Sequence, residues 1–128
     1  MERFIANAIH VAERMPVLNF ESWYFCMEVI FFDSSAHAFI QEQDTDTKAK
    51  IALLLDALSC HSYQLRMPYS KPLGKGLFEL RVVATVNVRI IYMFYKGNCV
   101  VLHWFVKKTM EIPAKDMLIA RVRQKRLK

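Results

Sequence analysis

The residues that decide the fold are LFELRVVATVNVRIIYMFYKGNCVVLHWF, positions 77–105 of the chain. They contain three runs rich in β-branched and aromatic side chains, which favour strands: Leu77 to Ala84, Val88 to Tyr95 and Cys99 to Phe105. Lys96-Gly97-Asn98, between the second and third runs, is typical of a hairpin turn. These residues therefore predict three successive strands of a mostly antiparallel sheet.

Side chains alternate between the two faces of a strand, so residue numbers decide which of them share a face. In the first strand Glu79 and Arg81 point the same way, and in the second Arg89 points away from Tyr92, which we therefore assign to the core. A three-residue connection through Thr85 would set Arg81 opposite Arg89, whereas a two-residue connection would put them on opposite faces. Two solvated arginines, one of them paired with Glu79, are the alternative interpretation and the commoner one for a generic sheet.

Two helices are expected before these strands. A strand-like run, Met27 to Phe32, precedes them, and Asp33-Ser34-Ser35 supplies N-cap candidates for the first helix. Asp44 to Thr47 supplies the cap of the second. The second helix has apolar residues at i, i+3, i+4 and i+7, the pattern of a helix packed on a core: Ile51, Leu54, Leu55 and Leu58.

The remaining segments are a loop and a last helix. Cys60 to Gly76 contains two prolines and several cations, and it predicts a polar loop. Pro113 is a favoured first helical residue and predicts a C-terminal helix with Asp116 in its first turn. The expected order is β-α-α-β-β-β-α, which is an α+β fold with helices packed on one mostly antiparallel sheet.

The length of 128 residues is that of a single domain. Hydrophobic residues make up 54% and charged residues 23%, a balance that excludes disorder. The longest apolar stretch, Ser22 to Phe32, is interrupted by Glu28 and is shorter than the ~20 residues that span a bilayer. The start of the chain lacks signal-peptide features, and three cysteines form no disulfide-framework pattern. We therefore expect a cytoplasmic protein without a membrane partner.

The net charge of +6 is divided unevenly along the chain. Residues 1–65 hold 4 basic and 9 acidic side chains, a net of −5, whereas residues 66–128 hold 14 basic and 3 acidic ones, a net of +11. A solvated basic tail is one explanation, since 5 of these cations lie in Arg121 to Lys128. Residues 66–120 still hold 9 cations against 3 acids, so the second half of the domain is expected to meet a polyanion such as a nucleic acid.

No residue pattern indicates a cofactor. Cys60-His61 and the pair of Cys99 and His103 lack the spacing of zinc ligands, and His103 is better explained as a half-buried strand residue. The chain contains neither a phosphate-binding glycine loop nor a serine nucleophile elbow. We therefore expect neither a metal nor a nucleotide cofactor.

Lys107 and Lys108 directly follow the third strand run. Lysines at a sheet edge commonly serve only solubility, but a strand end is also where a rigid scaffold presents functional groups. Convergence of Arg81, Arg89 and Lys108 would bind several phosphate oxygens. Like-charged neighbours also favour the neutral form of a lysine, which then accepts a proton.

Three motifs, in their order and spacing, resemble one family. They are KPLGKGLFELR at positions 71–81, RIIY at 89–92, and LHWFVKKT at 102–109, with Pro113 after them. Together they resemble the RelE/HigB superfamily of type II toxin–antitoxin toxins, and most closely its phage-derived HigB-like branch. The resemblance covers about Met27 to Arg123.

The resemblance implies a RelE-like toxin that cleaves mRNA without a metal, generally on the translating ribosome, and that a cognate helix-turn-helix antitoxin neutralises. The family's catalytic side chains fall on Arg81, Arg89 and the Lys107-Lys108 pair. We expect Arg89 to clamp the scissile phosphate and Arg81 to stabilise transition-state charge. Lys107 or Lys108 would transfer a proton. RNA binding is expected to involve four further cations: Lys71, Lys75, Arg121 and Arg123.

Residues 1–26 have no counterpart in that family, so the toxin domain is expected to comprise residues 27–128. One hypothesis is that translation starts at Met27. The other is that residues 1–26 are an added segment, with a short amphipathic helix over 2–15, that packs on the sheet or on a partner through Trp23 and Phe25.

Two other classes of function stay open. A non-catalytic RNA- or DNA-binding module, such as a decayed toxin, would use the same basic face without cutting. A structural partner in a protein complex would have no RNA affinity once its acidic partner is removed. For the antitoxin, the first two helices are a candidate docking surface, with Phe39 and Leu55 near their exposed edges.

Overall fold

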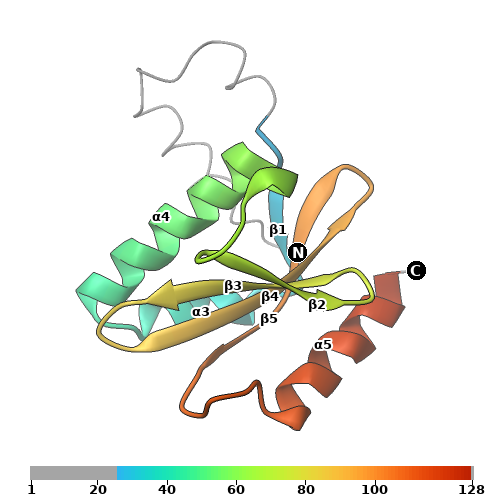
Figure 1. Ribbon diagram of the computed structural model, residues 1–128. Helices are drawn as coiled ribbons and strands as arrows, with labels where there is room; N and C mark the ends of the chain where they lie inside the picture. Colours follow the sequence, from blue (N-terminus) through green and yellow to red (C-terminus); the bar gives the residue numbers. More distant parts are fainter. Residues whose placement is uncertain (1–25, 128) are drawn as a thin grey trace.

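The computed structural model describes residues 26–127, and they form one five-stranded sheet with helices on both faces (Figure 1). The strand order is β1-β5-β4-β3-β2, with β1 parallel to β5 and every other pair antiparallel. The elements are β1 (Val29–Phe31), α3 (Ser35–Gln41), α4 (Thr45–His61), η1 (Ser62–Gln64), β2 (Ser70–Gly74), β3 (Leu77–Val83), β4 (Asn87–Tyr95), β5 (Asn98–Val106) and α5 (Ala114–Leu127). The expected α+β class is confirmed. The helix expected over residues 2–15, with Trp23 and Phe25, lies outside the described residues.

The prediction of a loop over residues 60–76 is wrong for its second half. Ser70–Gly74 forms β2, which pairs with β3 and places Lys71 opposite Glu79. Proline has no backbone N–H to donate, and Pro72 is tolerated because β2 lies at the edge of the sheet. Among the five residues of β2 only Ser70 is buried. An edge strand with polar residues and a proline has the composition of a loop, which is why the sequence predicts a loop here. The observed order is β-α-α-β-β-β-β-α.

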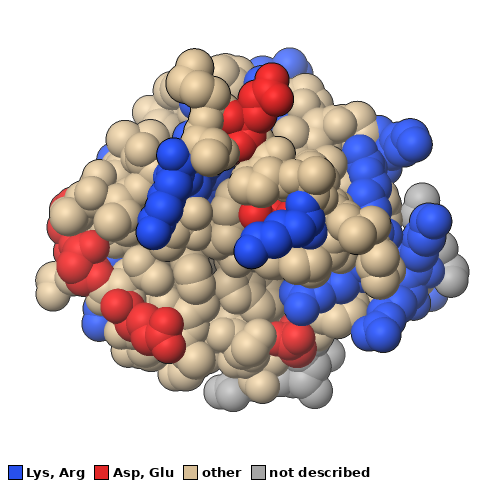
Figure 2. Space-filling view, turned by 90° about the horizontal axis from the view of Figure 1, so that it is seen from below, with Lys and Arg blue, Asp and Glu red and all other residues tan. Residues whose placement is uncertain are grey.

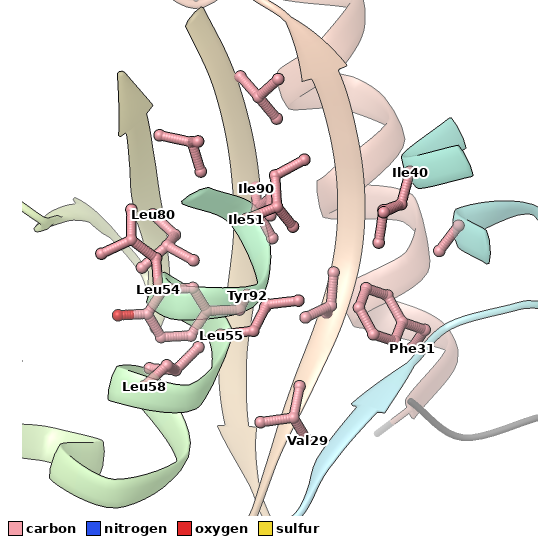
Figure 3. Close-up of a cluster of buried hydrophobic side chains, with 14 of the residues drawn as sticks. Val29, Phe31, Ile40, Ile51, Leu54, Leu55, Leu58, Leu80, Ile90 and Tyr92 are labelled. Carbon is pink, nitrogen blue, oxygen red and sulfur yellow. The ribbon is translucent and has the colours of Figure 1, made fainter. Parts of the chain in front are cut away.

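The two faces of the sheet carry separate cores. Helices α3 and α4 cover one face and α5 covers the other (Figure 1). On the α4 face, three residues of the predicted helical stripe, Ile51, Leu54 and Leu58, pack toward Leu80, Ile90 and Tyr92 of the strands (Figure 3). Leu55 belongs to the same core and is 2% exposed, so its expected place near an exposed edge is wrong. The smaller core joins α5 to the other face, with Ala120 against β-strand residues that include Leu77, Ile91 and Leu102.

Tyr92 lies in the larger core, as the alternation of β4 predicted. Its side chain is 1% exposed, and its hydroxyl lies 2.5 Å from the Ser70 hydroxyl of β2. Burial raises the pKa of Tyr92 to about 12, so the phenol stays protonated at neutral pH. Tyr92 therefore ties the edge strand to the core and is remote from the opposite face of the sheet.

The hairpin between β4 and β5 turns through Lys96 and Gly97, which have φ values of 50° and 80°. Positive φ at both central residues is the requirement of the tight turn that matches the twist of two antiparallel strands. Gly97 meets this requirement without the steric cost that a Cβ would impose. The predicted hairpin is thus confirmed, and it fixes the register of β5 against β4.

Asp44 caps α4 as its sequence position predicted. Its side chain accepts hydrogen bonds from the Thr47 backbone N–H at 3.1 Å and from the Thr47 hydroxyl at 2.6 Å. These two bonds, the hydroxyl first, hold the pKa of Asp44 below its ordinary value of 3.8. A carboxylate with a lowered pKa stabilises the fold above its unfolded-state pKa, and this contribution is lost as the pH falls through the folded-state pKa.

We expect Asp44→Ala to lower the melting temperature by a few degrees at pH 7, because α4 loses its cap. The difference from wild type should stay constant down to about pH 5 and shrink below about pH 4, where the wild-type carboxyl itself becomes protonated. Thermal unfolding followed by circular dichroism from pH 7 to pH 3 measures both effects. Glu42→Ala, which removes an exposed carboxylate next to the cap, is the matched control, and an equal effect of both variants would contradict the capping role.

Candidate active site

The register of β3 and β4 brings the two predicted arginines together. The strands are joined by the three residues Ala84-Thr85-Val86, and the Cα of Arg81 pairs with that of Arg89. Both side chains therefore lie on the α5 face of the sheet, which also carries Ile91. Of the two connections that the sequence allowed, the three-residue one is observed.

Glu79 lies at the centre of the charged side chains on this face. Its Oε2 atom is 3.3 Å from Nε of Arg89 and 4.0 Å from Nζ of Lys107. The side chains of Glu79, Arg89 and Lys107 are 4%, 6% and 13% exposed. One carboxylate thus faces two cations from two neighbouring strands, and with Arg81 the group keeps an excess of positive charge. We call Glu79, Arg81, Arg89 and Lys107 the basic cluster.

The basic cluster contains polar atoms without an aligned hydrogen bond. Among the described residues, the buried side-chain atoms of this kind include Glu79 Oε2, Arg81 Nε and Arg89 Nε. Buried polar groups in proteins nearly always have a partner, because leaving one unpaired costs about 1–3 kcal/mol. Glu79 Oε2 and Arg89 Nε face each other in the 3.3 Å ion pair, so Arg81 Nε is the donor of this group that remains available to a ligand with acceptor oxygens.

Arg89 is a buried side chain that carries a permanent positive charge. Burial lowers the pKa of Arg89 from its ordinary value. The Glu79 carboxylate opposes this effect, and the charge of Arg81 adds to it. Arginine nevertheless stays protonated in proteins at neutral pH. Arg89 is therefore a fixed cation in a medium of low dielectric, where its attraction for an anion is greater than in water.

The structure distinguishes Lys107 from Lys108, which the sequence left as equivalent candidates. The backbone N–H of Lys107 donates to the carbonyl of Asn87 at 2.8 Å, which continues the β5 ladder by one residue beyond Val106. Alternation from Phe105, which pairs with Arg89, then puts the Lys107 side chain on the face of the basic cluster. Lys108 follows outside the strand and is exposed. The catalytic residues expected from sequence therefore meet as Arg81, Arg89 and Lys107.

The four cations expected to bind RNA lie at different places. Lys71 is exposed on β2, opposite Glu79 and next to the basic cluster. The carbonyl of Lys75, in the β2–β3 turn, accepts a bond from Gln124 of α5. Arg121 donates to the Gly74 carbonyl, and Arg123 donates to the Leu102 carbonyl and stacks over two aromatic rings. Figure 2 shows Lys and Arg side chains gathering on the side of this view where α5 lies.

Glu79 is the member of the site whose importance the sequence did not predict. Its i, i+2 spacing from Arg81 predicts that both side chains lie on the same face of the sheet. A pair of Glu79 with an arginine entered only the alternative interpretation, in which both arginines are solvated. The central, buried position depends on Arg89 and Lys107, which are distant in sequence. His103, expected as a half-buried strand residue, is confirmed as one and contacts Asp116 of α5 at 2.7 Å.

In residues 26–127 no three His, Cys, Asp or Glu side chains are grouped so that they could hold a metal ion. The same part of the chain has no helix long and apolar enough to cross a membrane.

A basic cluster on one face of a mostly antiparallel five-stranded sheet, with three helices around the sheet, defines a class of small α+β protein compatible with the RelE-like fold. The chain belongs to the family of phage-derived Gp49-like proteins (DUF891), whose family model matches residues 38–125. This family is part of the RelE/ParE toxin-like superfamily and is associated with the toxins of toxin–antitoxin systems, which implies an antitoxin partner. No curated protein is significantly similar to the chain.

The buried pair of Glu79 and Arg89 leads to a stability prediction. Glu79→Ala leaves Arg89 buried without its counter-charge, and we expect the free energy of unfolding to fall by about 3–5 kcal/mol. Replacing both residues by leucine and methionine removes both charges and should recover most of that loss. Urea denaturation of the single and double variants measures the two values. Glu111→Ala, at an exposed carboxylate, is the control; a loss for Glu79→Ala below about 1 kcal/mol, as for a solvated ion pair, would contradict the geometry.

Proposed function

We propose that this protein is the toxin of a type II toxin–antitoxin system and acts as a metal-independent mRNA endoribonuclease on the translating ribosome. The observation that carries the proposal is the basic cluster: cations from three strands, with Arg89 buried and Arg81 and Lys107 partly exposed, converge around one carboxylate on one face of the sheet. The toxin-like family supports the same class of function. The substrate and the ribosome place the activity in the cytoplasm, and the HigB-like branch would supply a helix-turn-helix antitoxin.

The chemistry that suits these residues is attack by a ribose 2′-hydroxyl on the adjacent phosphate. The bond from the 2′-oxygen to phosphorus forms while the bond from phosphorus to the 5′-oxygen breaks, so the products are a 2′,3′-cyclic phosphate and a 5′-hydroxyl. The 2′-hydroxyl proton passes to water, and the 5′-oxygen takes a proton from the Lys107 ammonium group. The pentavalent phosphate in between carries additional negative charge, which needs nearby cations.

The exposure of the two arginines suggests how they divide this work. Arg81 is partly exposed and Arg89 is 5% exposed, so Arg81 is the guanidinium that reaches a phosphate oxygen directly. Arg89 is buried next to Arg81 and is paired with Glu79. Its positive charge would act on the phosphate through the protein interior, where the dielectric constant is low. This assignment exchanges the roles that the sequence suggested. Lys71, on the neighbouring edge strand, would bind the RNA backbone beside the cluster. Lys75, Arg121 and Arg123 would extend this contact along α5.

Alanine variants of the two adjacent lysines test the site. Lys107→Ala should abolish growth arrest after induced expression, because the leaving oxygen loses its proton donor, whereas Lys108→Ala should arrest growth like wild type. Arg81→Ala should lower the cleavage rate about 100- to 1000-fold, the usual cost of removing a preorganised donor to transition-state charge. Circular dichroism confirms that each variant is folded. Equal effects of the two lysine variants would contradict the assignment.

Mapping of RNA 5′ ends after brief induction distinguishes the enzyme from a binding module. The proposal predicts new 5′ ends within coding regions for the wild-type protein and about 100- to 1000-fold fewer for Arg81→Ala. A decayed toxin that only binds RNA or DNA would leave no new ends in either case. Purified protein added to a translation extract should produce the ends only when initiation is allowed, because the substrate is mRNA on translating ribosomes. Ends that form in the presence of an initiation inhibitor would refute the dependence on the ribosome.

A further inference from the structure

A second feature of the molecule lies at the β2 edge of the sheet, on the α4 side, where the chain passes from α4 to β2 and meets the basic cluster through Arg81. Two adjoining hollows, of about 430 and 350 Å³, are found here and share Leu65, Arg66 and Met67 in their walls. Neither hollow has an aspartate or glutamate among its lining residues, whereas Arg66 lines both and His61 lines the larger. The hollows are thus apolar and cationic, without a compensating negative charge in their walls.

Large apolar side chains are exposed at these hollows. Tyr63, Met67, Leu53 and Tyr69 are 64%, 55%, 52% and 48% exposed, and they make up half of the eight large hydrophobic side chains that are exposed in residues 26–127. Single exposed apolar side chains are normal on a protein surface, but a contiguous group marks a binding site. We call Tyr63, Arg66, Met67 and Tyr69 the 63–69 platform.

The platform is held in place by the surrounding structure. The ring of Tyr63 packs against Phe94 of β4, with ring centroids 4.3 Å apart. The carbonyl of Arg66 accepts backbone hydrogen bonds from Tyr69 at 3.0 Å and from Ser70 at 3.1 Å, which close the turn into β2. A preorganised aromatic surface loses less conformational entropy on binding than a mobile one.

The platform is continuous with the basic cluster through Arg81. The backbone N–H of Arg81 donates to the Tyr69 carbonyl at 2.8 Å, and its Nη1 lies 3.6 Å from the Met67 sulfur. A phosphate bound at the Arg81 guanidinium would therefore have the next part of its molecule at Met67 and Tyr69. In single-stranded RNA that next part is a nucleoside, whose base is flat and stacks on aromatic rings and guanidinium planes.

We propose that the 63–69 platform is a nucleobase-binding subsite, which receives the base of a nucleotide adjacent to the scissile phosphate. This inference rests on the proposed function and names the part of the protein that would recognise the substrate. Base stacking explains the exposed tyrosines, and the absence of carboxylates from the walls suits a polyanion. A purely apolar segment of a protein partner would leave the Arg81 guanidinium without an acceptor.

The experiment maps cut sites in induced cells for the wild-type chain, Tyr69→Ala and Tyr63→Ala. Each alanine variant should cut about 5- to 150-fold less often, the range expected for the loss of one base-stacking contact. The base preference next to the cut should also flatten, whereas a loss of phosphate binding would lower cutting at all sequences alike. Tyr69→Phe keeps the ring and should cut like wild type. Leu118→Ala is the matched control, since Leu118 on α5 is 64% exposed and distant from the platform in sequence.

A binding measurement tests the platform independently of cleavage. The full chain is titrated with a single-stranded 2′-O-methyl RNA, which has no free 2′-hydroxyl and is not cut, and with the same strand carrying one base-free ribose at successive positions. Loss of one base should weaken binding to wild type at one position and leave binding to Tyr69→Ala unchanged there. Arg81→Ala should weaken binding to both strands equally.

The outcomes separate this inference from the proposed function. Wild-type protein that produces no new 5′ ends refutes the endoribonuclease, and the binding measurement still decides the platform. Wild-type cutting with an unchanged rate and base preference in both alanine variants overturns the platform. Variants that cut normally but are no longer neutralised by the antitoxin would assign the surface to the antitoxin and overturn the inference as well.

Discussion

The contact of the Glu79 carboxylate with Arg89 and Lys107 is the interaction on which the rest of the site depends. Its three residues come from β3, β4 and the end of β5, so all three strands must be in their observed register for the charges to meet. An unpaired charge at this depth would cost several kcal/mol, a large part of the 5–15 kcal/mol that stabilises a typical domain. The cores on both faces of the sheet, with α3 and α4 on one and α5 on the other, keep the strands rigid enough to hold the contact.

This contact also explains how several cations can lie side by side without a bound anionic ligand. Glu79 offsets one positive charge, and the remaining excess keeps the face attractive to phosphate. Arg81 remains partly exposed above the buried pair and touches Met67 at the edge of the platform. Phosphate chemistry and base recognition would therefore share one side chain. In this account the domain that cuts the RNA would also carry the surface that recognises it.

Much of this arrangement follows from local sequence patterns. The runs of β3 to β5, the glycine turn at Gly97, the cap at Asp44 and the core position of Tyr92 were predicted because each depends on neighbouring residues. Alternation along β3 and β4 left two possible registers, one with Arg81 and Arg89 on the same face and one with them on opposite faces. The edge strand β2 was missed because an edge tolerates proline and exposed polar side chains. The choice between Lys107 and Lys108 depended on where β5 ends, and element boundaries are poorly encoded in sequence.

The most direct test of the central claim, that the basic cluster promotes attack by the ribose 2′-hydroxyl, is the chemistry of the RNA ends. RNA from cells that briefly express the wild-type chain is ligated to an adaptor that requires a 5′-phosphate, before and after treatment with polynucleotide kinase. The account predicts 5′-hydroxyl ends, which ligate only after the kinase adds a phosphate, and 2′,3′-cyclic phosphates on the matching upstream fragments. New ends that ligate without the kinase would carry a 5′-phosphate and would contradict the mechanism.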